Sequence, residues 1–258
     1  MDWTRRELLA AGAAGVLGWA ANGDEPAAPR MGVVLYSYGI RRAADKDGGI
    51  ADPMTFVAYC RQLGASGAQT PLGVRGDDYA DKLREYCDYN KLYLEGIVTL
   101  PRDKDDVGRF TDEVRTAKRC GAAVFRSALL NGRRYETFDD AEAFARFLEK
   151  GKQSLALAKP VVEKHEVRMA VENHKDLRAP ELLDVLKGLD SPLVGVCLDT
   201  GNSIALLEPP EETAELLAPH AFTTHIKDMG VEEYPDGFLL AEVPLGAGFL
   251  DLPKIAAA

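Results

Sequence analysis

The sequence is poor in positive charge. Its 31 lysine and arginine residues stand against 41 aspartate and glutamate residues, which gives a formal net charge of −10 at pH 7. A protein that binds nucleic acid or an anionic membrane surface needs the opposite balance, because it must neutralise phosphate groups. The composition therefore argues against nucleic acid as a partner and against stable membrane association.

Cysteine is also scarce, and its spacing indicates no special chemistry. The four cysteines are Cys60, Cys87, Cys120 and Cys197, and no two of them form a CxxC pair. Three of them fall in apolar stretches, where a small buried thiol is the usual interpretation. A disulfide framework is typical of much shorter secreted chains, so we expect structural, unpaired cysteines.

Long hydrophobic runs are missing, and the longest weakly apolar stretch lies close to the N-terminus. Arg5 and Arg6 precede the run 10–21, and an acidic segment rich in proline and alanine follows it over 22–29. A bilayer span needs about 20 apolar residues, which makes a membrane anchor the weaker alternative. The paired arginines instead predict that residues 1–28 are a signal peptide and leader of the twin-arginine type. We therefore expect an exported, periplasmic protein.

From residue 29 onward, short apolar runs alternate with longer amphipathic ones. The predicted strands are 32–38, 67–70, 93–100, 122–128, 168–173, 193–199 and 221–227. The predicted helices are 53–63, 78–90, 105–120, 139–165, 180–187 and 211–217. Strands that alternate with helices in this way predict βα units and a parallel sheet in one domain over 29–258.

The glycine-rich phosphate loop of a dinucleotide fold does not follow the first predicted strand. The sequence has Tyr36, Ser37 and Tyr38 there, which favours a (β/α)8-type TIM barrel over a Rossmann or P-loop fold. The last residues, 256–258, fall inside what resembles the seventh helix. We therefore expect an α/β barrel that is truncated before its eighth strand and has two exposed sheet edges.

Three of the predicted strands end in a side chain that can bind a metal. Glu172, Asp199 and His225 each lie on the strand face that carries the smaller residues, and they are 27 and 26 residues apart. Side chains alternate between the two faces of a strand, so all three are expected to face the barrel axis. Barrel enzymes build their active sites at this end of the strands. Two carboxylates and an imidazole suit one divalent ion, namely manganese, cobalt, magnesium or zinc.

Three motifs resemble those of a known family. The segments Val171-Glu172-Asn173-His174, Asp199-Thr200-Gly201-Asn202 and His225-Ile226-Lys227-Asp228 are similar in order and spacing to the sugar phosphate isomerase/epimerase family with the xylose isomerase-like TIM barrel. The resemblance implies that Glu172, Asp199 and His225 bind one divalent ion, together with a second glutamate from the eighth strand. It also implies that this ion holds two adjacent oxygens of a sugar.

The predicted function is a metal-dependent isomerase or epimerase of a sugar, keto-sugar or sugar derivative. Deprotonation of a carbon beside a carbonyl gives an enediolate, and a divalent cation stabilises the charge that develops. Glu172 is the candidate base as well as a ligand. A lyase or dehydratase on the same barrel is the alternative, and a non-catalytic carbohydrate-binding barrel is a third interpretation. An apurinic endonuclease is disfavoured because the chain has only four histidines and a negative charge.

Three further residues are candidates for binding a small-molecule carbohydrate. His174 and Lys227 share strand faces with Glu172 and His225, and Asn202 stands where some ketose epimerases of the family place a histidine. Glu95 is a weaker candidate, since a carboxylate near the end of the third predicted strand has an equal chance of pairing with Arg126 or Lys91. The other two histidines, His165 and His220, lie at predicted helix ends, where we expect them to cap the helices rather than to bind a substrate. The sequence leaves the substrate and a homo-oligomeric state open.

Overall fold

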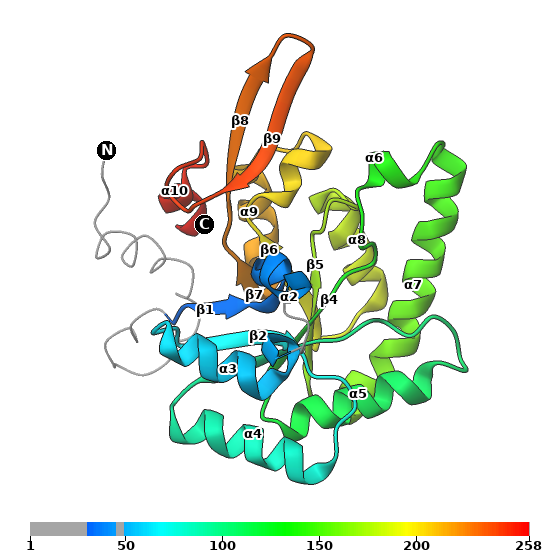
Figure 1. The fold of residues 1–258 in the computed structure, drawn as a ribbon. Helices are drawn as coiled ribbons and strands as arrows, with labels where there is room; N and C mark the ends of the chain where they lie inside the picture. The colour runs from blue at the N-terminus through cyan, green and yellow to red at the C-terminus, as the bar shows by residue number, and fades with distance from the viewer. Residues whose placement is uncertain (1–29, 45–48, 258) are drawn as a thin grey trace, which may run out of the picture.

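The computed structural model describes residues 30–44 and 49–257. Seven strands form one parallel sheet whose spatial order follows the chain: β1 Gly32–Val34, β2 Gly67–Pro71, β3 Tyr93–Ile97, β4 Val124–Ser127, β5 Arg168–Glu172, β6 Val194–Asp199 and β7 Ala221–His225. Helices cover the outside of this sheet (Figure 1). The helices of the described residues are α2 Gly39–Ala44, α3 Pro53–Gln62, α4 Asp77–Tyr89, α5 Val107–Arg119, α6 Arg134–Thr137, α7 Ala141–Lys164, α8 Ala179–Leu189, α9 Pro210–Leu217 and α10 Leu252–Ala256. Short 3-10 helices are η2 Leu35–Tyr38, η3 Gly49–Ala51, η4 Asn202–Leu206 and η5 Ala218–His220.

The sheet curls so strongly that its last strand faces its second and third strands across the interior. His225 of β7 lies 2.8 Å from Gln69 of β2, measured from Nε2 to Oε1. Thr223, also on β7, donates a hydrogen bond to Glu95 of β3 at 2.9 Å. The architecture is therefore the open, seven-stranded TIM-type barrel that the sequence predicts, with strand ends converging on one interior.

Several helices begin where the sequence supplies a capping side chain. Asp52 accepts a hydrogen bond from the Thr55 N–H at 3.1 Å at the start of α3. Asp140 accepts one from the Ala143 N–H at 2.6 Å at the start of α7. Such caps satisfy N–H groups that have no partner within the helix. The predicted helices accordingly end within about two residues of the observed ones.

The core lies between the outer face of the sheet and the helices. Its largest fully buried side chains include Phe56, Phe110, Phe125, Leu155 and Leu182. All four cysteines are buried and unpaired, as expected. Burial of large apolar side chains contributes about 1.5–3 kcal/mol each, which makes this layer the main source of stability.

Three details of the predicted strands are wrong, and the simplest is that the third strand ends at Ile97 rather than at residue 100. The first strand ends at Val34 rather than Tyr38, because its pairing with β2 stops at Val34 and the chain closes into the 3-10 helix η2. Strand alternation also predicts that Phe222 packs on helices with the other bulky residues of its strand. It instead packs against Val124, Ala170 and Cys197, because β7 shifts register by one residue against β6 at this point.

An antiparallel hairpin follows β7, and the sequence patterns did not predict it. Its strands are β8 Asp228–Tyr234 and β9 Gly237–Val243, which project from the barrel in Figure 1. Buried Asp228 ties the end of the hairpin down. Its carboxylate accepts hydrogen bonds from the N–H groups of Gly246 at 3.0 Å and Gly248 at 2.9 Å. The hairpin thereby stands in a fixed place beside the β7 strand end.

The predicted signal peptide and leader, residues 1–28, lie outside the described residues. Export through the twin-arginine route therefore stays a prediction. Within 30–44 and 49–257, no helix has the length and apolar character needed to cross a bilayer.

Candidate metal centre

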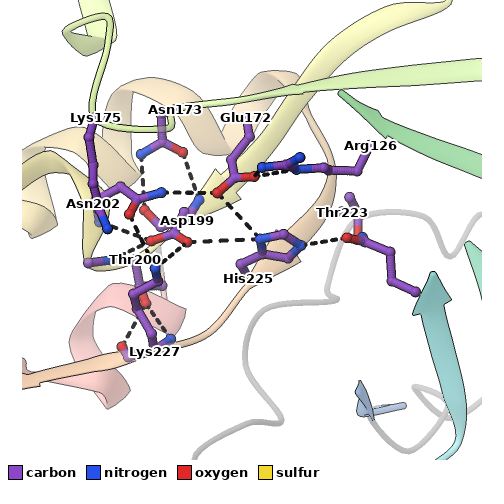
Figure 2. A network of polar contacts seen from close by, with 12 residues as sticks. Arg126, Glu172, Asn173, Lys175, Asp199, Thr200, Asn202, Thr223, His225 and Lys227 are labelled. Atoms are coloured by element: carbon purple, nitrogen blue, oxygen red, sulfur yellow. Dashed lines mark hydrogen bonds and ion pairs between the residues drawn. The ribbon is translucent and has the colours of Figure 1, made fainter. Parts of the chain in front are cut away.

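Glu172, Asp199 and His225 end β5, β6 and β7 and point toward one another (Figure 2). His225 Nδ1 lies 3.5 Å from Glu172 Oε1 and 3.9 Å from Asp199 Oδ2. Both carboxylates are buried, with Glu172 4% and Asp199 1% exposed. The structure therefore brings together the three side chains that strand phase predicted.

Backbone and amide contacts fix the Asp199 side chain in this position. Asp199 Oδ1 accepts hydrogen bonds from the N–H groups of Gly201 at 3.0 Å and Asn202 at 2.9 Å. Asn173 bridges β5 to β6 by bonding both the N–H and the carbonyl of Asp199. These contacts use Oδ1 and leave Oδ2 turned toward His225 and toward Lys227, whose Nζ forms an ion pair with it at 3.1 Å.

Glu172 is held by two side chains. Arg126, on the interior face of β4, donates from Nε and Nη2 to Oε2, and this ion pair is almost wholly buried. Asn202 donates from Nδ2 to Oε1 at 3.0 Å. Burial raises the pKa of Glu172, but His225 and Arg126 outweigh this effect and hold the pKa well below its usual range. Glu172 is therefore ionised at neutral pH.

A chain of hydrogen bonds on the opposite side orients His225. Gln69 Nε2 donates to Glu95 Oε2 at 2.8 Å, which turns Gln69 Oε1 toward His225 Nε2, also at 2.8 Å. Since Oε1 can only accept, Nε2 of His225 carries a proton. The Nδ1 atom then faces Glu172 and Asp199.

The three facing atoms form a site for a cation. Glu172 Oε1 and Asp199 Oδ2 are acceptors, as is Nδ1 of a neutral His225 ring, so their approach is favourable when positive charge lies between them. Two ligands that each bind a metal at about 2.1 Å stand roughly 3–3.5 Å apart. This range matches the 3.5 Å from His225 Nδ1 to Glu172 Oε1 and is shorter than the 3.9 Å to Asp199 Oδ2. Lys227 pairs with Asp199 Oδ2, and the oxygen and nitrogen donor set fits one divalent ion in place of that ammonium group.

Cys197 is a weaker ligand candidate than Asp199. Its sulfur lies within 4.8 Å of ligand atoms of both Glu172 and His225. Complete burial raises the pKa of this thiol well above its ordinary value, and the Glu172 charge raises it further. A metal binds the thiolate, so ligation by Cys197 requires loss of this proton. The neutral thiol packs with Val124 and Ala170.

Two lysines and a hairpin carboxylate border the ligand set. Lys227 Nζ lies 3.1 Å from Asp199 Oδ2 and donates to Asn202 Oδ1 at 3.2 Å. It also donates to Glu242 Oε1, on β9, at 2.9 Å. Lys175 Nζ lies 3.8 Å from that same Glu242 oxygen. His174 is adjacent and mostly buried; its Nδ1 makes no hydrogen bond to the described residues, and burial lowers its pKa.

The structure places the other candidates as follows. Asn202 is buried and links Glu172 to Lys227 rather than standing open. Glu95 does not pair with Arg126 or Lys91. It accepts hydrogen bonds from Gln69 and Thr223 instead. Both remaining histidines lie at helix ends, as expected. His165 is the C-terminal cap of α7, and His220 is the last residue of η5.

Sequence reasoning missed Gln69, Lys175 and Glu242, and it considered Arg126 only as a partner of Glu95. A polar residue in the interior phase of a predicted strand was the available signal for Gln69 and Arg126. Lys175 and Glu242 gave no such signal, because one lies in a loop and the other in the unpredicted hairpin.

A parallel βα barrel with two carboxylates and an imidazole at its strand ends defines a TIM-barrel protein with a candidate metal centre. The family model described as xylose isomerase-like TIM barrel matches residues 57–258. The chain belongs to this family.

A curated relative and two solved structures show how the family varies. The chain is 36% identical over 104 residues to a 3-oxo-isoapionate decarboxylase of Pectobacterium atrosepticum, which is 38% of this chain and 38% of the relative. It superposes on D-psicose 3-epimerase of Clostridium cellulolyticum H10, solved with D-tagatose, with a TM-score of 0.60, 17% identity and coverage of 77% of this chain and 73% of that one. For the IOLI protein, solved with a zinc atom, the TM-score is 0.62 at 16% identity, covering 87% and 82%.

These likenesses differ in what they establish. The matched segments span less than two fifths of the length of the curated relatives. The identities to the two solved structures are low enough that they show the fold alone. The chain thus belongs to the xylose isomerase-like TIM-barrel family, and the proteins it is similar to include an epimerase, a decarboxylase and a protein solved with a zinc atom.

Proposed function

We propose that the protein is a divalent-metal-dependent isomerase or epimerase of a sugar, keto-sugar or sugar derivative. The observation that carries the proposal is the convergence of Glu172 Oε1, Asp199 Oδ2 and His225 Nδ1, three acceptor atoms that face one another inside the barrel. Family membership and the epimerase neighbour support the same reaction class. When bound, a divalent ion supplies positive charge for the negative charge that develops on substrate oxygens.

Glu172 is the residue to which the proposal assigns the proton transfer. Arg126 donates to Oε2 and Asn202 to Oε1, and the carboxylate they hold is the group that accepts a proton from a carbon beside the substrate carbonyl. The C–H bond breaks, its electron pair forms the carbon–carbon double bond of an enediolate, and the carbonyl oxygen takes the charge. Return of the proton to the neighbouring carbon, with transfer of the hydroxyl proton to the former carbonyl oxygen, gives isomerisation. Protonation of the same carbon from the opposite face, by a second proton donor such as water, gives epimerisation. His174, Asn202 and Lys227 bind and orient the sugar in this scheme.

A lyase on the same site is the second candidate. The specific observation in its favour is the 36% identity to a decarboxylase over 104 residues. Loss of carbon dioxide from a 3-oxo acid breaks a carbon–carbon bond and leaves its electron pair in an enolate. The charge therefore develops on the same carbonyl oxygen, and the same residues serve both reactions.

Metal content and solvent deuterium exchange test the proposal together. The wild-type protein, Glu172→Gln and His225→Ala are loaded with manganese or zinc, dialysed and analysed by elemental mass spectrometry. His220→Ala, an exposed histidine at the end of η5, is the matched control. Each metal-loaded protein is then incubated with a panel of keto-sugars in D₂O, and deuterium incorporation is read by NMR.

We expect one ion per chain in the wild type and the control, and less than a tenth of that in His225→Ala. The wild type and the control should also incorporate deuterium at the carbon beside the carbonyl. Release of carbon dioxide from 3-oxo acids without exchange into keto-sugars would select the lyase. If no protein bound metal and none exchanged deuterium, the catalytic proposal would be wrong and the carbohydrate-binding interpretation would replace it.

A further inference from the structure

Two ammonium groups meet at one carboxylate oxygen beside the ligand set. Glu242 Oε1 accepts a hydrogen bond from Lys227 Nζ at 2.9 Å and lies 3.8 Å from Lys175 Nζ. The two lysine side chains are mostly covered, at 21% and 19% exposed, whereas the Glu242 side chain is 59% exposed. The lysines therefore belong to the wall of the site, and the carboxylate between them comes from solvent-facing β9.

The backbone of Lys175 has an unfavourable conformation, and contacts with neighbouring residues hold it there. Its φ angle is +83°, in the region that residues other than glycine rarely adopt. The Arg134 N–H bonds to the Lys175 carbonyl at 3.0 Å and fixes the turn after β5. Backbone strain of this kind costs about 1–3 kcal/mol and persists where the surrounding structure enforces it.

The charge of Lys175 is poorly compensated. Burial lowers its pKa, and the neighbouring Lys227 lowers it further. Its ion pair with Glu242, at 3.8 Å, is longer than a hydrogen bond. Lys227 has two close partners, Asp199 and Glu242, whereas among the described residues Lys175 has only the distant one. A carboxylate placed between the two lysines would therefore compensate the charge of Lys175 better than Glu242 does.

We infer that Lys175 and Lys227 bind the carboxylate of a sugar acid, and that Glu242 occupies this place only while no substrate is present. This inference rests on the proposed function and names its substrate class: an acidic carbohydrate whose carbonyl end lies toward Glu172, Asp199 and His225. Lys227 reaches both regions, since its Nζ lies 3.1 Å from Asp199 Oδ2. Entry of the substrate carboxylate displaces the Glu242 side chain toward solvent.

A pair of probes that differ only in charge tests the carboxylate subsite. D-gluconate and its neutral amide, D-gluconamide, are titrated into the protein by calorimetry. The protein is first stripped of metal with a chelator and dialysed, so that binding of metal by the probe contributes nothing. We expect gluconate to bind about tenfold more tightly than the amide, since a charge-assisted hydrogen bond is worth at least that factor.

Three variants separate the roles of the groups. Lys175→Met should abolish the preference for gluconate, while Lys175→Arg should retain part of it and thereby show that the loop still folds. Glu242→Gln should strengthen gluconate binding several-fold without changing amide binding, because the internal competitor is gone. Lys152→Met, which removes an exposed lysine paired with Glu149 on α7, is the matched control and should leave both affinities unchanged.

Equal affinities for the two probes, absence of gluconate binding, or an unchanged preference in Lys175→Met would each overturn the inference. The outcome is independent of the proposed reaction. Failure of metal binding and deuterium exchange, with the gluconate preference intact, would remove the isomerase and leave an acid-binding site. Metal-dependent exchange without any gluconate preference would leave the isomerase and remove the subsite.

Discussion

The amide of Gln69 decides which nitrogen of His225 faces the two carboxylates. It donates to Glu95 and therefore presents its oxygen to His225 Nε2. A group that fixes the tautomer of a metal-binding histidine also raises the affinity for the metal. Gln69 thus acts through His225, as a positioning residue.

Replacement of Gln69 by leucine tests this role. In Gln69→Leu the Nε2–H loses its acceptor, so His225 should populate both tautomers and manganese affinity should fall about 10–100-fold. Nitrogen chemical shifts of the histidine ring in the metal-free protein report the tautomer, and calorimetry reports the affinity. Gln62→Leu, on the exposed side of α3, serves as the control. An unchanged tautomer would contradict the role.

Arg126 is the counter-ion that permits Glu172 to stay charged inside the barrel. Both side chains are less than a tenth exposed. In Arg126→Met a buried carboxylate is left without its partner, and the free energy of unfolding should fall by about 3–5 kcal/mol. Urea denaturation at neutral pH measures this loss. The exposed pair of Arg133 with Glu136 provides a comparison, because Arg133→Met should cost less than about 1 kcal/mol.

At the scale of the elements, the hairpin of β8 and β9 depends on a close approach between the Asp228 carboxylate and the backbone at Gly248. A Cβ atom at Gly248 would overlap the Asp228 carboxylate and the Met229 carbonyl. The hydrogen bonds from Gly246 and Gly248 to Asp228 could then not form together. Since β9 carries Glu242, the position of this carboxylate depends on the same contact.

Gly248→Ala should therefore loosen the hairpin while the barrel remains folded. We expect a loss of about 1–3 kcal/mol, the cost of leaving a buried polar group unsatisfied, together with faster proteolysis within 228–250. Mass spectrometry of a limited digest locates the cleavage. Gly188→Ala is the matched control: a Cβ there meets nothing within 4 Å, so helix α8 should gain about 0.5–1 kcal/mol. Equal digestion of the two variants would exclude the proposed contact.

At the scale of the whole molecule, the candidate metal centre joins three consecutive strands of an open barrel. β5, β6 and β7 each supply one ligand candidate, and Gln69 of β2 contacts the same histidine. An ion at this point would bind the folded chain and not the unfolded one. Metal should therefore stabilise the entire fold rather than a local segment.

Thermal unfolding with and without manganese measures this effect. At a free metal concentration of about 100 times the dissociation constant, the fold should gain about 2.7 kcal/mol, a shift in melting temperature of roughly 5–10 °C. His225→Ala should show less than a fifth of this shift, whereas His220→Ala should behave as the wild type. A shift of the same size in both variants would place the ion elsewhere.

The sequence by itself determined the order of strands and helices, the parallel sheet, and the strand face on which each of the three ligand candidates lies. These features depend on local hydrophobic period and on the alternation of side chains along a strand, which neighbouring residues fix. The sequence pattern alone is therefore enough to predict that Glu172, Asp199 and His225 lie together.

Only the tertiary structure decided which partners surround them. Gln69 meets His225 across 156 positions of the chain, and Thr223 meets Glu95 across 128, because the sheet curls until β7 faces β2 and β3. The one-residue shift that turns Phe222 inward and the hairpin that brings Glu242 to Lys227 depend on contacts between distant segments. Such contacts leave no period in the local sequence. The pattern of strands and helices thus predicted where the ligand candidates lie, and the closure of the barrel determined how they are oriented and charged.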